Sequence, residues 1–205
     1  MERNIPIYKA IIDDEDINSG VYTMSLVEAP AIMVDFVTLS AQENKFQFKL
    51  QSAEKQILAG PFLIPNMLIY RNDKENGEYY LKWDEPVIEK TAQRFMELKN
   101  QDQINQDHSS SNYVEDAYIV ESWIIEDPEK DKSALYGFNL PKGTWFGLVK
   151  INNSTYWKDY VKTGKVKGFS IEGYYEFQKV EQTRHQLSQD DLLIQQLKQL
   201  LNEEE

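Results

Sequence analysis

Short apolar segments of strand length, separated by turn-forming residues, run through most of the chain. Residues 45–50 (Lys-Phe-Gln-Phe-Lys-Leu) alternate apolar and polar side chains, a pattern typical of a half-buried strand. The segments that predict strands are 5–12, 45–50, 79–83, 117–126, 144–151 and 166–180, beside apolar stretches at 20–39 and 56–70. The total of about seven strands and three helices, irregularly spaced, argues against a doubly wound parallel sheet. The sequence therefore predicts a mainly β (α+β) fold.

Three segments predict helices. Asp84 can cap the first helix, Pro86 suits its first turn, and apolar residues then recur at helical spacing. A second, short amphipathic helix is expected over 154–162. The third covers 188–202, where a narrow apolar stripe is formed by Leu193, Leu197, Leu200 and Leu201. An isolated helix of about 15 residues is marginal in water, so this one needs a surface to pack against.

Polar and turn-forming segments predict the loops. The acidic run 13–16 predicts a solvated turn, the tip 72–78 a hairpin connection, and the polar stretch 99–113 a loop. We expect one domain over residues 1–182, followed by an acidic, amphipathic C-terminal helix or tail over 183–205.

The composition excludes several classes of protein. The 205 residues include 22 Lys and Arg against 34 Asp and Glu, which gives a net charge of −12. Such an acidic chain is a poor binder of nucleic acid, because phosphate contacts need clustered Lys and Arg. The absence of cysteine excludes disulfides, a thiol nucleophile and Cys-ligated metals, and two histidines argue against a multi-His metal centre. With neither a signal peptide nor an apolar run of about 18 residues, we expect a soluble intracellular protein without cofactor or membrane contact.

Two residues are the first candidates for chemistry. His108 lies in the polar loop just before an apolar strand, where a lone histidine is either a surface residue or a general base. Ser170 lies in a β-prone stretch between Gly168 and Gly173, and it is either an ordinary strand serine or a nucleophile. The pattern differs from the Gly-x-Ser-x-Gly elbow of α/β-hydrolases, because residue 172 is Glu and the second glycine comes one position late.

Two carboxylates compete to orient such a histidine. Glu121 shares a strand face with Ile119, Trp123 and Ile125. Burying an acid on such an apolar face costs free energy unless the acid is paired. Glu121 is therefore either an edge-strand acid exposed to water or a buried acid beside a histidine. Glu172 projects to the same face as Ser170, about 7 Å along the strand. Glu121 is our first choice for this role.

Five segments occur in an order that resembles a known family. They are residues 58–71 (Leu-Ala-Gly-Pro-Phe-Leu-Ile-Pro-Asn-Met-Leu-Ile-Tyr-Arg), the loop with His108, 118–127 (Tyr-Ile-Val-Glu-Ser-Trp-Ile-Ile-Glu-Asp), 140–145 (Leu-Pro-Lys-Gly-Thr-Trp) and 166–173 (Val-Lys-Gly-Phe-Ser-Ile-Glu-Gly). Together, over about residues 20–180, the chain resembles the phage serine proteases of prophages and tailed phages, which belong to the prohead (capsid-maturation) proteases and are related in fold to herpesvirus assemblin.

The resemblance implies a closed or partly closed β-barrel with flanking helices, in which His108 is the base and Ser170 the nucleophile. In relatives of the more common topology, a stretch similar to residues 25–31 (Ser-Leu-Val-Glu-Ala-Pro-Ala) follows the nucleophile, so this barrel looks circularly permuted. In those relatives, an acid often stands two residues before the serine that begins this stretch, and this chain has Thr23 at that position. Assemblin uses a histidine as its third member, but His185 lies too far into the tail. Glu121, Glu172 or no third residue therefore remain as alternatives.

The function implied by the resemblance is that of a serine endopeptidase. Its expected substrates are phage scaffold and major capsid proteins, and itself, and its expected location is the host cytoplasm, inside assembling proheads. A homo-oligomer is compatible with this function. The alternatives are an inactive barrel that acts as a structural or scaffold component of the phage head, and an unrelated intracellular β-protein.

Overall fold

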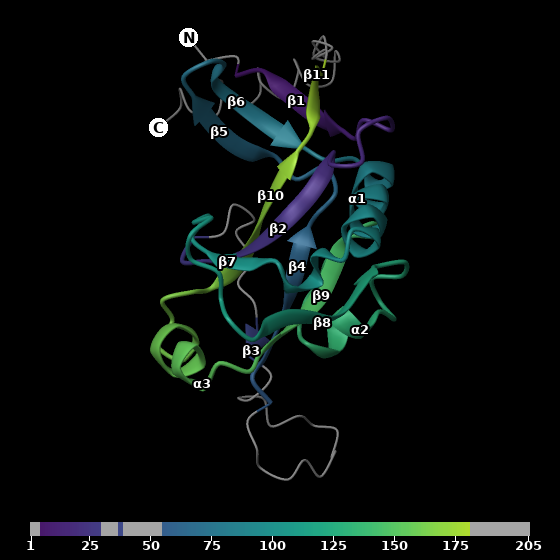
Figure 1. Ribbon diagram of the computed structural model, residues 1–205. Helices are drawn as coiled ribbons and strands as arrows, with labels where there is room; N and C mark the ends of the chain where they lie inside the picture. The colour runs from purple at the N-terminus through teal and green to yellow at the C-terminus, as the bar shows by residue number, and fades with distance from the viewer. Residues whose placement is uncertain (1–4, 30–36, 39–54, 181–205) are drawn as a thin grey trace, which may run out of the picture.

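The computed structural model describes residues 5–29, 37–38 and 55–180, and the described chain is dominated by strands (Figure 1). The strands are β1 (Ile7–Ile11), β2 (Gly20–Val27), β3 (Val37–Thr38), β4 (Ile57–Leu63), β5 (Ile69–Asp73), β6 (Gly77–Lys82), β7 (Ile104–Gln106), β8 (Ala117–Ile124), β9 (Trp145–Ile151), β10 (Gly168–Tyr174) and β11 (Glu176–Lys179). The helices are α1 (Glu85–Glu97), the 3₁₀ turn η1 (Asn100–Asp102), α2 (Lys132–Leu135), and α3 (Ser154–Tyr156) with its π-helical continuation η2 (Trp157–Val161). The prediction of a mainly β protein is confirmed.

The described strands form three separately hydrogen-bonded sheets, with the orders β11-β1-β6-β5, β10-β2-β7 and β3-β4-β9-β8. The closed barrel, one of the two predicted forms, is therefore not found among the described residues. One reason is that β7 has only three residues and ends at a turn where Asp107 and His108 both have positive φ, so its sheet ends there. Another is that β10 stops before Tyr175, and the chain continues as β11 beside β1 in a different sheet (Figure 1).

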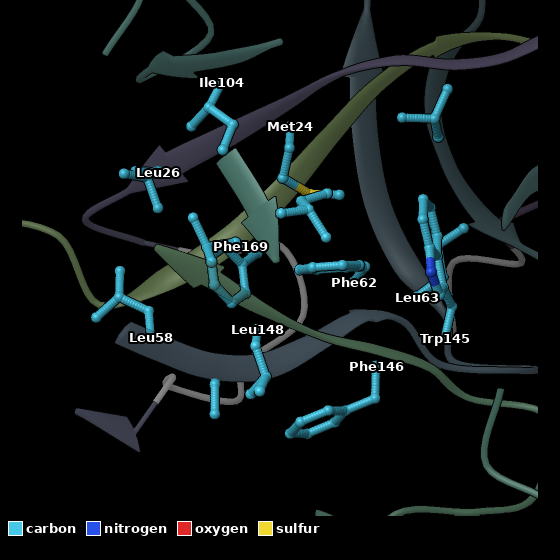
Figure 2. Close-up of a cluster of buried hydrophobic side chains, with 14 of the residues drawn as sticks. Met24, Leu26, Leu58, Phe62, Leu63, Ile104, Trp145, Phe146, Leu148 and Phe169 are labelled. Atoms are coloured by element: carbon cyan, nitrogen blue, oxygen red, sulfur yellow. The ribbon is translucent and has the colours of Figure 1, made fainter. Parts of the chain in front are cut away.

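Successive side chains of β2 point alternately to the hydrophobic core and to the opposite face of the sheet. Met24 and Leu26 are fully buried and lie beside Phe169 of β10 in the hydrophobic cluster (Figure 2). The Phe62 ring packs edge-to-face against Phe169, with 5.0 Å between ring centroids. Because successive side chains of a strand point to opposite faces, Ser25 projects away from this cluster. The core therefore fixes β2 against β10 and leaves their other face for polar residues.

Most of the predicted elements are confirmed within the described residues. The helix predicted after Asp84 is α1, whose apolar face buries Ile88, Ala92 and Phe95. The predicted hairpin is β5–β6. The segment 99–113, expected to be a loop, contains β7, because a parallel pairing with β2 stabilises a segment whose own sequence is mostly polar.

Three predictions lie outside the described residues: the strand at 45–50, the tail helix at 188–202, and the position of His185. Within the described part of the chain, no helix combines the length and the apolar character that crossing a bilayer requires.

Candidate active site

Three strands place polar side chains in one row across the sheet β10-β2-β7. Ser170 of β10 lies directly opposite Ser25 of β2, and Ser25 lies beside Asn105 of β7. Residues paired directly across strands project to the same face, with Cβ atoms about 4.5–5.5 Å apart in an antiparallel pair. The two serines and the asparagine therefore share one face, opposite the hydrophobic cluster.

Hydrogen bonds tie this row to Glu172, two residues beyond Ser170. The Ser25 Oγ lies 2.6 Å from Asn105 Oδ1 and 2.9 Å from Glu172 Oε1. The Asn105 Nδ2 donates to the same carboxylate oxygen over 2.6 Å. Ser25 and Asn105 are fully buried, whereas the Glu172 side chain is 18% exposed. Glu172 Oε1 thus has two buried polar partners.

His108 reaches this cluster from a strained turn. It is the second residue after β7, and Asp107 and His108 have φ values of 51° and 59°, a region that L side chains rarely adopt. Strained backbone of this kind costs about 1–3 kcal/mol per residue and concentrates at functional sites. The turn brings His108 Nδ1 to 3.2 Å from Ser25 Oγ and 3.5 Å from Glu172 Oε1. The imidazole remains 45% exposed, so a substrate can approach it.

Ser170 lies beside Ser25, the serine whose hydroxyl is close to the His108 imidazole. In the described part of the chain, no hydrogen bond links Ser170 with His108, and the hydroxyl within reach of Nδ1 is that of Ser25. Ser170 is buried, with 6% of its surface exposed. The structure thus brings together His108, Glu172 and two adjacent serines, of which sequence reasoning selected one.

Glu121 has a different partner. It lies on β8, which pairs with β9 in another sheet, and its half-exposed carboxylate forms an ion pair with Lys132 of α2. The bulge between Ile119 and Glu121 interrupts the strict alternation on which its predicted burial depended. The carboxylate beside His108 is that of Glu172, the alternative left open by the sequence.

Tyr22 approaches the outer oxygen of Glu172. Its hydroxyl donates to Glu172 Oε2 over 3.4 Å, and its ring stacks on Tyr174 with 5.0 Å between centroids. Burial, and secondarily the negative charge of Glu172, raise the pKa of the Tyr22 phenol above its ordinary value. Tyr22 therefore stays protonated and able to donate. Within the described residues, no group of three or more His, Asp or Glu side chains is arranged to hold a metal ion.

Comparison with known protein families shows the family to which the chain belongs. The family model described as "Putative phage serine protease XkdF" matches residues 45–179, well over half the chain. The chain belongs to this family. The predicted membership is therefore confirmed. No curated protein and no solved structure matches the chain.

The match to the phage serine protease family contains most of the cluster. Asn105, His108, Ser170 and Glu172 lie inside the matched span, and Ser25 lies before it. Sequence reasoning did not select Ser25 or Asn105 as site residues. For Ser25 a signal was available, since it begins the stretch 25–31 on which the permutation was inferred. For Asn105 the sequence offers none, because its position depends on the pairing of β7 with β2.

Proposed function

We propose that this phage serine protease is an endopeptidase in which His108 is the general base, Glu172 orients it, and Ser170 is the nucleophile. The observation that carries the proposal is the approach of His108 Nδ1 to the Glu172 carboxylate, 3.5 Å away, on the sheet face that also carries Ser170. A serine, a histidine and an acid on one face are the components of acyl transfer to a hydroxyl.

The choice of Ser170 over Ser25 is supported by their surroundings. Ser25 is fully buried and its hydroxyl lies close to two oxygen acceptors, whereas Ser170 keeps a small exposed surface. The imidazole lies 3.2 Å from Ser25 Oγ, and Ser170 is the residue directly paired with Ser25, with Cβ atoms of such pairs about 5 Å apart. Catalytic hydrogen bonds are often long in the free enzyme and shorten when substrate binds.

In the proposed reaction, Ser170 is first acylated by the substrate and then released by water. Nδ1 faces Glu172, so Nε2 takes the proton of the Ser170 hydroxyl while Oγ bonds to the carbonyl carbon of the scissile peptide. The C–N bond then breaks, the proton passes from Nε2 to the leaving amine, and an ester joins Ser170 to the acyl half of the substrate. Water attacks this ester with His108 again as base, which releases a carboxylic acid and restores Ser170.

The substrates that we propose are the scaffold and major capsid proteins of the phage, and the enzyme itself, cleaved inside the assembling prohead in the host cytoplasm. Membership of a phage serine protease family supports this assignment. The competing hypothesis is that the chain is an inactive structural component of the head.

The test is labelling of the purified protein with a serine-directed fluorophosphonate, followed by peptide mapping. We expect an adduct on Ser170 that is lost in Ser170→Ala and strongly reduced in His108→Ala. Ser109→Ala is the matched control, because Ser109 lies in the same turn and its hydroxyl contacts only Ser111 among the described residues. A protein that forms no adduct and trims no scaffold or capsid protein would support the structural component instead.

A further inference from the structure

We propose that Ser25 and Asn105 are positioning residues, which together hold Glu172 and fix the tautomer of His108. This inference rests on the proposed function and assigns a role to the second serine of the site. The alternative is that Ser25, which is nearer to the imidazole, is itself the nucleophile.

The position of the single hydroxyl proton of Ser25 separates these two roles. A serine hydroxyl has one proton and two lone pairs, and both Asn105 Oδ1 and Glu172 Oε1 can only accept, at 2.6 and 2.9 Å from Ser25 Oγ. The shortest contact of Ser25 Oγ is with Asn105 Oδ1, so we assign the Ser25 proton to that oxygen. A serine that is activated by a histidine must instead direct its proton to the imidazole nitrogen.

The orientation of the Asn105 amide is fixed by its surroundings. Its Nδ2 faces Glu172 Oε1 at 2.6 Å. The opposite orientation would set the amide oxygen against a carboxylate oxygen at this distance, with no proton between them. Asn105 therefore donates to Glu172 and accepts from Ser25, and these two hydrogen bonds join the three side chains into a triangle of contacts. Because Asn105 and Ser25 are almost completely buried, water does not replace these bonds easily.

The triangle determines which nitrogen of His108 carries the proton. Nδ1 faces a lone pair of Ser25 Oγ at 3.2 Å and the Glu172 carboxylate at 3.5 Å. Both atoms accept a hydrogen bond once the Ser25 proton is held by Asn105. The Nδ1–H tautomer is therefore stabilised, and Nε2 is left with the lone pair that a general base needs. Removing the Ser25 hydroxyl removes one of the two acceptors that hold Nδ1–H.

The experiment compares Ser25→Ala with Ser109→Ala, using the full chain and two readouts. The first is ¹⁵N NMR of the imidazoles, which reports the tautomer directly. The chain has only two histidines, so a His185→Gln variant assigns His108. The second is kcat and KM on a scaffold-derived peptide, together with the position and rate of fluorophosphonate labelling.

We expect the Nδ1–H signature for His108 in the unaltered protein and in Ser109→Ala, and a shift towards Nε2–H in Ser25→Ala. In Ser25→Ala, kcat should fall about 10- to 100-fold with KM nearly unchanged, while the adduct still forms on Ser170. Asn105→Asp is a second variant of equal size. It places a carboxylate against Glu172 and favours the protonated imidazole, so the acid limb of kcat/KM should move to higher pH.

An adduct on Ser25, or an unchanged tautomer with unchanged kcat in Ser25→Ala, would overturn the inference. If the protein forms no adduct at all, the proposed function fails. The NMR comparison still decides in that case whether Ser25 fixes the His108 tautomer, so the two failures can be distinguished.

Discussion

Glu172 lies directly opposite Thr23 in the register of β10 against β2. Thr23 stands two residues before Ser25, where the resemblance to relatives of the more common topology leads one to expect an acid. Directly paired residues share a sheet face, so a carboxylate on the neighbouring strand can occupy the space that an acid at position 23 would use. We infer that Glu172 supplies this acid from β10, and its contact with His108 supports that inference.

The first prediction concerns this carboxylate. Glu172→Gln keeps the size of the side chain and removes its charge, so it should lower kcat about 100-fold or more, because an uncharged partner stabilises the imidazolium poorly. Circular dichroism and the melting temperature should show an intact fold. Glu121→Gln is the matched control and should retain near-normal turnover, since Glu121 is paired with Lys132. A loss of turnover in Glu121→Gln alone would restore Glu121 as the third residue.

The second prediction concerns two glycines at close approaches. A Cβ at residue 173 would lie 2.4 Å from the Gly20 carbonyl oxygen, and a Cβ at residue 147 would lie 2.3 Å from the Phe62 ring. Either alanine substitution should lower the free energy of unfolding by about 1–3 kcal/mol, measured in urea. Gly173→Ala should also lower the activity of the folded protein, because it displaces the bulge beside Glu172. Equal specific activity in the two variants would contradict this.

The third prediction concerns the acidic turn before β2. The Nη1 atom of Arg94, on α1, lies 2.9 Å from the carbonyl oxygens of Asp13 and Ser19 and 3.0 Å from that of Asp16. Arg94→Ala should cost about 1.5–3 kcal/mol, because charged hydrogen bonds to a partly buried turn are lost.

Lys90→Ala provides the comparison for Arg94. Lys90 forms an exposed ion pair with Asp14, and such pairs contribute about 0–1 kcal/mol. If the two variants show the same midpoint in urea, Arg94 does not anchor the turn.

The fourth prediction concerns alkaline pH. Burial raises the pKa of the Tyr175 phenol well above its ordinary value, and the hydroxyl lies 3.1 Å from Thr91 Oγ1. Above about pH 10 the unfolded chain releases this proton while the folded chain retains it, so stability falls as the pH rises. Urea midpoints between about pH 8 and pH 11 should fall less steeply in Tyr175→Phe. An unchanged slope in Tyr175→Phe would contradict the assignment.

The sequence by itself determined the features that depend on local periodicity. Helix α1 follows from a proline in its first turn and apolar residues at helical spacing, whereas Asp84 stands at the N-cap position without a side-chain capping hydrogen bond. The β5–β6 hairpin follows from a polar tip between apolar runs. It also determined the family, and it selected His108 and Ser170 because these residue types stand in motifs that relatives share. Local pattern and motif order are properties of the chain alone.

Only the tertiary structure decided which groups meet. Ser25 is separated by 80 residues from Asn105 and by 147 from Glu172, and all three come together because β2 pairs with β7 on one side and with β10 on the other. Register across strands depends on the packing of Met24, Leu26 and Phe169 in the core. The same cause separates Glu121 from the site, because β8 pairs in a different sheet. Strand pairing depends on many weak contacts between segments that are far apart in the sequence, so it cannot be predicted from any one segment alone.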